Sequence, residues 1–222
     1  MQTTTQTKYI NSLQEHQPSL PCSDSLYDLR SEIGIWREAH TSWLREGEWR
    51  FAPIYRRTGG IKLLTAYQTR FHLHVTVIER ALSNHTGYHR QVFIRNDATR
   101  EQEIKVVLHQ KPFLDRKDPA MSFYAPLSKA LIHYDGVRYT TTFAKGAEAT
   151  TTECAVGELE KVWQEKKGQL TVQPLSARVN ESTITTAITL RANEETSVDQ
   201  WVHVSQSMAE SESFLAQFHK KD

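Results

Sequence analysis

The sequence predicts an all-β fold, a large two-sheet antiparallel β-sandwich with a short C-terminal helix. Three observations lead to this prediction. In several segments every second residue is apolar, which is the pattern of a strand with one buried face. Turn-forming residues separate these segments at short intervals. Helix-type spacing is scarce before the C-terminal end, whereas a parallel α/β sheet needs a helix between successive strands.

The strand segments are clearest in the middle of the chain. TRFHLHVTVIE places Phe71, Leu73, Val75 and Val77 on one face. The same alternation returns in YHRQVFIR, EIKVVLHQ, STITTAITL and VDQWVHVS. Asp135-Gly136 stands between two short apolar runs, and Asp-Gly is among the strongest signals for a hairpin because both residues tolerate the positive φ of a tight turn. We therefore expect a hairpin over residues 130–144.

The chain of 222 residues is expected to form one large domain with two dissimilar ends. Residues 1–25 are rich in Thr, Gln, Ser and Pro and are predicted to be poorly ordered or divergent. Residues 26–204 contain the strand segments and are assigned to the β-sandwich. Residues 205–222 are predicted to form a helical, linker-like tail.

The predicted tail helix has a recognisable start and one apolar stripe. Ser207 and Glu210 have the spacing of a capping box. Met208, Leu215 and Phe218 then lie along one side of the helix. Such a helix either folds back on the sandwich or docks on a partner, and the pattern alone leaves both open.

Composition excludes several classes of function. Lys and Arg number 27 and Asp and Glu number 26, so the net charge is +1 and no block of like charges occurs. We therefore expect neither nucleic acid nor a membrane as a partner. The sequence has no apolar run long enough to span a bilayer and no signal-peptide pattern. Cys22 and Cys154 have no metal-ligand spacing, so they are interpreted as reduced thiols of a cytoplasmic protein.

Most catalytic patterns are missing. His72 and His74 have the HxH spacing of two metal ligands on one side of a strand. If ALSNHTG turns the chain, residue 74 pairs near residue 94, and no third ligand comes close. No metal site and no cofactor is predicted. The sequence also lacks a G-x-S-x-G nucleophile and a phosphate-binding loop.

Two groups of residues leave a carbohydrate function open. Trp36, Trp43 and Trp49 fall within 14 residues. A sugar ring can lie on the face of an indole, although tryptophans are also buried in the core of a β-sandwich. Asp115 and Asp118 form a carboxylate pair of the kind that glycosidases use. Such a pair on a polar loop is more often solvated charge.

A series of short motifs runs through the strand segments, namely Arg95-Asn96-Asp97, His109, Tyr124-Ala125-Pro126, the hairpin from His133 to Tyr139, Trp163, Gly168-Gln169-Leu170 and Ser182-Thr183-Ile184. In order and spacing, these motifs resemble the N-terminal β domain of bacterial and archaeal family 15 glycoside hydrolases, the glucoamylase, glucodextranase and trehalase group. With Gly34 and Trp36, the resemblance covers residues 30–205. The Asn-Gly-rich first strand and turn of that family are not found in the first residues.

The resemblance implies a supersandwich that packs, through a helical linker, against an (α/α)6 barrel holding both catalytic glutamates. It implies no catalytic residue and no cofactor here. The expected function is that of a noncatalytic N-terminal domain, truncated or separately encoded, which supports a barrel acting on α-glucosidic bonds. Met208, Leu215 and Phe218 would then contact the missing barrel, with folding back as the alternative.

Two other functions stay open. The first is a stand-alone carbohydrate-binding module for an α-glucan oligosaccharide, using Trp36, Trp43 or Trp49. The second is an independent glycosidase that uses Asp115 and Asp118.

Overall fold

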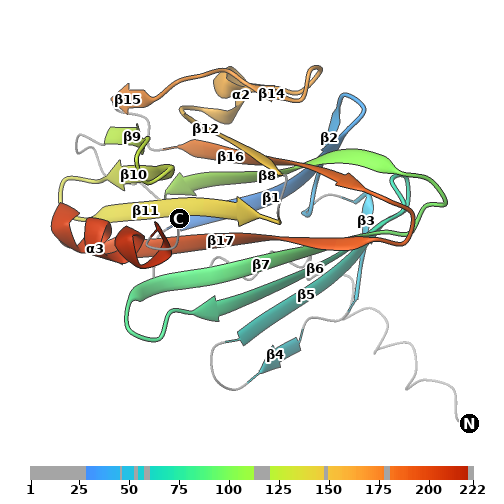
Figure 1. Cartoon of the computed structure of the whole chain (residues 1–222), viewed down its shortest axis with the longest axis horizontal. Helices are drawn as coiled ribbons and strands as arrows, with labels where there is room; N and C mark the ends of the chain where they lie inside the picture. Colours follow the sequence, from blue (N-terminus) through green and yellow to red (C-terminus); the bar gives the residue numbers. More distant parts are fainter. Residues whose placement is uncertain are drawn as a thin grey trace, which may run out of the picture.

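The computed structural model describes residues 29–45, 47–52, 55–57, 61–112, 121–147, 150–177 and 181–219. Two antiparallel sheets face each other (Figure 1), which confirms the predicted β-sandwich. The smaller sheet has the strand order β12-β16-β8-β1-β2. Its strands are β1 (Leu29–Arg37), β2 (His40–Trp43), β8 (Gln102–Pro112), β12 (Thr151–Val156) and β16 (Ser182–Leu190).

The larger sheet has ten strands in the order β15-β9-β10-β11-β17-β7-β6-β5-β3, with β4 paired to β5. Its strands are β3 (Trp49–Phe51), β4 (Tyr55–Arg57), β5 (Ile61–Gln68), β6 (Leu73–Ala81), β7 (Thr86–Asn96), β9 (Met121–Ala125), β10 (Ala130–Tyr134), β11 (Tyr139–Gly146), β15 (Leu175–Ala177) and β17 (Glu195–Ser205). Short elements complete the fold, namely α2 (Leu159–Val162), β13 (Trp163–Gln164), β14 (Gln169–Leu170) and α3 (Met208–His219). Neither helix in the described part of the chain is long and apolar enough to cross a membrane.

The core lies between the two sheets and follows the alternation of the sequence. Leu73, Val75 and Val77 are buried on the inner face of β6. They pack in one cluster with residues of the facing sheet such as Ile33 and Leu108. Fully burying an aliphatic side chain contributes about 1.5–3 kcal/mol, so this cluster is the main apolar contribution to stability.

The hairpin at Asp135 forms as predicted. β10 and β11 pair with Tyr134 opposite Tyr139, and Gly136 has a φ of 91°. The Asp135 carboxylate accepts hydrogen bonds from the backbone N–H of Val137 and Arg138, at 2.9 and 2.6 Å. Partial burial favours a higher pKa for Asp135, but these hydrogen bonds and the Arg138 charge outweigh it and lower the pKa. The turn is held by its own side chains.

The same hairpin carries one of the polar links between the sheets. His133 of β10 is buried, and its Nδ1 lies 2.8 Å from Ser122 Oγ of the neighbouring strand. Its Nε2 lies 2.8 Å from Ser182 Oγ of β16, in the other sheet. His133 therefore has a structural role.

Arg90 forms a second polar link, which the alternation does not predict. Arg90 occupies an inward position on β7, and its side chain is therefore only 1% exposed. The guanidinium donates to Glu79 Oε2 at 2.7 Å, to Ser31 Oγ of the facing sheet at 2.6 Å, and to Gln200 Oε1 at 3.1 Å. A buried charge is tolerated only when it is paired and hydrogen-bonded in this way.

The expected pairing of residue 74 near residue 94 is confirmed to within one residue. His74 pairs with Arg95 and not with residue 94, because the turn is centred half a residue later than assumed. His72 also lies outside the strand, in a turn with a φ of 53°. The two imidazoles therefore do not form a strand-borne HxH pair.

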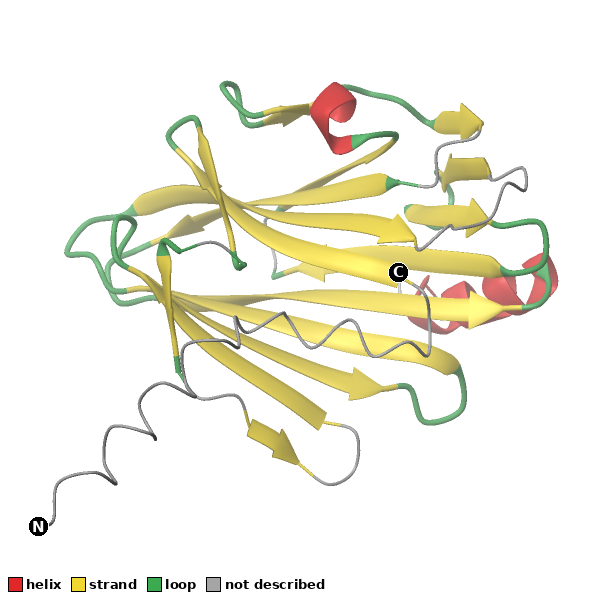
Figure 2. Cartoon of the chain, turned by 180° about the vertical axis from the view of Figure 1, so that it is seen from behind, coloured by secondary structure: helices red, strands yellow, loops and turns green. Residues whose placement is uncertain are grey.

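Helix α3 folds back on the sandwich, across β11 and β17 (Figures 1 and 2). Ser207 Oγ accepts a hydrogen bond from the Glu210 N–H at 3.2 Å, which confirms the predicted cap. Leu215 is buried with Phe214 against Ala130 and Phe143. Phe218 packs on the same cluster, and Met208 is half-buried.

The expectation of a free interface to a barrel is therefore corrected for Leu215 and Phe218, and it stays a prediction for Met208. The sheet of the same chain covers Leu215 and Phe218. The predicted stripe also omitted Phe214, the most deeply buried apolar residue of the helix, at 1% exposed. The reason is that this part of the sheet presents its own aromatic residues, which attract the helix.

His203 lies on β17 beneath this helix. Its ring stacks on Phe214 with centroids 4.3 Å apart, and the His85 ring lies 5.1 Å away. Its Nδ1 has no hydrogen-bond partner among the described residues. Burial, together with the neighbouring His85, lowers the pKa of His203 to about 4, although Glu210 opposes the shift.

We expect stability to fall as the pH drops from about 6.5, the ordinary histidine pKa, to about 4. In that window the unfolded chain holds a proton on His203 that the folded chain does not, so acid favours unfolding. The measurement is the free energy of unfolding against pH. His203→Phe should flatten the slope in this window, whereas the exposed control His72→Gln should keep it. Equal slopes in all three proteins would contradict the assignment.

Asn96 joins two neighbouring turns of the sandwich. It is fully buried, and its Nδ2 donates to the backbone carbonyls of Arg100, Leu190 and Arg191 at 2.8, 3.1 and 2.9 Å. We expect Asn96→Ala to lower the free energy of unfolding by about 3 kcal/mol, since buried carbonyls lose their donor. Thr99→Ala, an exposed position in the same turn, should change it by less than about 0.5 kcal/mol. Urea denaturation of both variants measures the difference, and an equal effect would refute the role of Asn96.

Candidate functional site

A groove crosses four strands of the five-stranded sheet and also reaches Thr196 of β17 in the larger sheet. Trp36 of β1 pairs with Lys105 of β8, Lys105 with Ala187 of β16, and Ala187 with Thr151 of β12. These four cross-strand neighbours all line one hollow of about 490 Å³. Ala187 has the smallest side chain of the four.

A second hollow, of about 350 Å³, adjoins the first. Trp36 and Glu103 line both, so the two hollows meet at these side chains. The remaining lining of the smaller one is Arg37, Glu38, Arg100, Glu101 and Gln102. Both volumes fall in the range of small-molecule sites, about 300–1,000 Å³.

The Trp36 ring is half-buried and held on one side by the hairpin of β13 and β14. Its Nε1 donates a hydrogen bond to the Glu165 carbonyl at 2.6 Å. The Trp163 ring meets it edge-on, with centroids 6.5 Å apart. Gly168, at a φ of 61°, lies so close that a Cβ there would be 2.5 Å from the indole. The orientation of Trp36 is therefore fixed.

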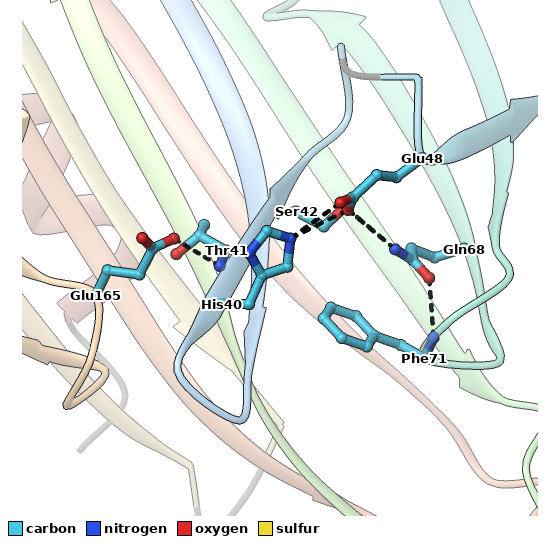
Figure 3. A network of polar contacts seen from close by, with 7 residues as sticks. All are labelled: His40, Thr41, Ser42, Glu48, Gln68, Phe71 and Glu165. Atoms are coloured by element: carbon cyan, nitrogen blue, oxygen red, sulfur yellow. Dashed lines mark hydrogen bonds and ion pairs between the residues drawn. The ribbon is translucent and has the colours of Figure 1, made fainter.

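The neighbouring strand β2 is held from both sides (Figure 3). On the outer side, Glu165 Oε1 accepts a hydrogen bond from the Thr41 N–H at 2.8 Å, and Trp163 Nε1 donates to Thr41 Oγ1 at 3.0 Å. On the other side, Ser42 Oγ donates to Glu48 Oε2 at 2.6 Å. These contacts fix the β1–β2 hairpin that carries Trp36.

Glu48 is the centre of the polar network in Figure 3. His40 Nε2 lies 3.2 Å from both of its carboxylate oxygens, and Gln68 Nε2 lies 3.3 Å from Oε2. The Ser42 hydrogen bond is the largest cause of the lowered pKa of Glu48, with His40 and Gln68 adding to it against the effect of burial. Because Gln68 belongs to the larger sheet, the network ties the two sheets together.

The network contains a serine, a histidine and an acid, but it is not a nucleophile triad. Ser42 and His40 both point at the Glu48 carboxylate (Figure 3). A catalytic serine instead needs its hydroxyl bonded to the base. The arrangement supports a structural role.

The structure separates the three predicted tryptophans. Trp49 is 5% exposed and belongs to the core between the sheets. Trp43 is 8% exposed and packs with Val107 and Trp163. Neither presents a ring face to a sugar, so the stacking expectation is corrected for both. Trp36 alone of the three lines an open groove, while Asp115 and Asp118 lie outside the described residues.

Several other titratable groups are used inside the fold. In the described ranges, no set of three or more His, Cys, Asp or Glu side chains is placed to hold a metal ion. His109 Nδ1 lies 3.1 Å from Thr183 Oγ1. The pKa of Glu181 is lowered to about 2, first by His109 and further by Lys111, against burial. Burial raises the pKa of the Cys154 thiol to about 12, with the Glu153 charge adding to the shift, so this thiol is not a ready nucleophile.

Sequence reasoning missed the residues that shape the groove. Glu165 and Gly168, which orient Trp36, are distant from it in sequence and carry no signal of that contact. The Gly168-Gln169-Leu170 motif marked the segment but not its role. Lys105 and Ala187 were assigned only to strands, because their place in one row depends on the register.

No protein-family model and no curated protein sequence matches this chain. Solved structures do match. A bacterial glucoamylase in complex with acarbose aligns with a TM-score of 0.61 and 10% sequence identity, over 86% of this chain and 29% of that chain. A "putative kojibiose phosphorylase from human microbiome" aligns with a TM-score of 0.53 and 15% identity, over 88% of this chain and 26% of that one.

We expect Gly168→Ala to destabilise the protein and to disturb Trp36. The new methyl group would lie 2.5 Å from the indole. In addition, the positive φ at this position is unfavourable for alanine. Gly136→Ala is the matched control. Gly136 also has a positive φ, so alanine is unfavourable there as well, but no atom lies within 4 Å of the added Cβ. The melting temperature and the Trp36 indole N–H signal in NMR measure the two effects. A Trp36 signal shifted equally in both variants would contradict the contact.

The two structural matches establish the fold and not the activity, because identity is low. This chain spans less than a third of either matched enzyme. It therefore has the β-sandwich fold that forms one part of a bacterial glucoamylase and of the phosphorylase.

Proposed function

We propose that this chain is a noncatalytic β-sandwich domain of the family 15 glycoside hydrolase type, which supports an (α/α)6 catalytic barrel acting on α-glucosidic bonds. The observation that carries the proposal is the pair of partial matches. They cover 86% and 88% of this chain, but only 29% and 26% of the two enzymes. The order of motifs from Arg95 to Ile184 favours the same group.

Two of the described carboxylates, Glu48 and Glu181, are suited to a structural role. A glycosidase needs one carboxylic acid with a raised pKa to protonate the leaving group. Glu48 and Glu181 instead have lowered pKa values and are bound to their neighbours. Both groups are suited to hold the fold together.

The proposal also includes a partner barrel and a location. The stripe of α3 is covered by the sandwich, so a barrel would have to dock on another surface. We propose a cytoplasmic location, which rests on the use of only two cysteines in the chain.

The test is an assay of the purified 222-residue chain with maltose, trehalose, isomaltose and longer dextrins. We expect no release of glucose above that of the buffer, because the catalytic glutamates belong to the barrel in the proposed arrangement. Turnover that disappears in Asp115→Asn would overturn the proposal in favour of an independent glycosidase. Turnover unchanged by that variant would direct the search to the other carboxylates and would equally overturn it.

A further inference from the structure

We propose that the groove at Trp36 binds a neutral oligosaccharide, with the Trp36 indole as its stacking platform. The choice of an α-glucan as the saccharide rests on the proposed function. The site itself rests on the shape, the charge and the fixed aromatic ring of the groove.

The Trp36 ring is preorganised for binding a ligand. The β13–β14 hairpin holds one side of Trp36 through the Glu165 carbonyl and Gly168. The side chain is nevertheless half-exposed and lines both hollows. A flat apolar surface that is already fixed loses little conformational freedom on binding, and the C–H face of a pyranose matches it.

The charge of the lining indicates a neutral ligand. Three cations and four carboxylates line the two hollows, namely Arg37, Arg100, Lys105, Glu38, Glu101, Glu103 and Glu194. A site for phosphate or nucleic acid needs an excess of cations. A nearly balanced set of carboxylates and cations can instead accept from and donate to sugar hydroxyls.

The rest of the lining adds hydrogen-bonding groups. Four threonines line the larger hollow, namely Thr150, Thr151, Thr189 and Thr196. Gln102 lines the smaller one and is 2% exposed. Its Nε2 donates to the Phe71 carbonyl at 2.9 Å, whereas its Oε1 has no partner among the described residues. This oxygen is buried as well, so the threonines are the hydrogen-bonding groups that a ligand in the groove can reach.

The direction of the groove indicates the length of the ligand. The row from Trp36 to Thr151 crosses four strands, and three interstrand steps span about 14 Å. The smaller hollow extends the groove beyond Trp36. This length suits a short oligosaccharide, so a trisaccharide should bind more tightly than glucose.

The experiment follows the indole N–H signals of the five tryptophans by NMR while maltotriose, and separately glucose, is added to the full chain. Trp36→Phe assigns the Trp36 signal. We expect this signal to move at millimolar maltotriose while those of Trp43 and Trp49 stay in place. Calorimetry of the same samples gives the dissociation constant.

Two variants test the groove. Trp36→Ala should weaken binding at least tenfold, and Ala187→Leu, which fills the floor and leaves Trp36 in place, should do the same. Lys161→Ala, at an exposed site on α2, is the control and should bind like the unchanged chain. The signals of the other tryptophans report whether each variant is folded.

Several outcomes would overturn the inference. These are a Trp36 signal that does not move at high-millimolar maltotriose, full binding in Ala187→Leu, or binding of inorganic phosphate in place of maltotriose. None of these outcomes affects the result of the turnover assay. The two experiments together therefore distinguish a noncatalytic domain with a sugar site from one without such a site. Turnover, in contrast, would refute the proposed function and leave the groove to be judged by binding.

Discussion

The structure depends on the packing of two sheets whose inner faces are mostly apolar and are linked to each other by buried polar residues. Arg90 is the most demanding of these, because an unpaired guanidinium cannot stay in such a core. Glu79 neutralises its charge, and Ser31 accepts a hydrogen bond from the facing sheet. His133 makes a similar link between the sheets through Ser122 and Ser182. These contacts specify how the sheets face each other, which apolar packing alone leaves poorly defined.

Each sheet is also covered in part on its outer face. Helix α3 lies over β11 and β17, where Phe214 and Leu215 meet Phe143. The segment of α2, β13 and β14 covers Trp43 and Val107 on the smaller sheet. The groove at Trp36 begins where this second cover ends, so one arrangement both buries Trp43 and leaves part of Trp36 accessible.

The polar groups near the groove illustrate why residue types alone do not define an active site. Ser42, His40 and Glu48 lie together, yet the hydroxyl and the imidazole bind the same carboxylate and neither activates the other. The lowered pKa values of the Glu48 and Glu181 carboxylates come from hydrogen bonds and charges of neighbouring side chains in the fold. The same sandwich fold occurs in enzymes whose larger part lies outside it, so function has to be argued from specific sites.

The sequence by itself determined the all-β class, the inner faces of the central strands, the Asp135 hairpin and the start of the last helix. Each of these follows from local chemistry, namely side-chain alternation, turn propensity and capping. Only the tertiary structure decided which tryptophan is accessible, that His74 pairs with Arg95, and that α3 packs on its own sheet. Exposure and docking depend on which distant segment covers a residue, as Gly168 and Glu165 do for Trp36. Alternation along a strand carries no information about that covering segment.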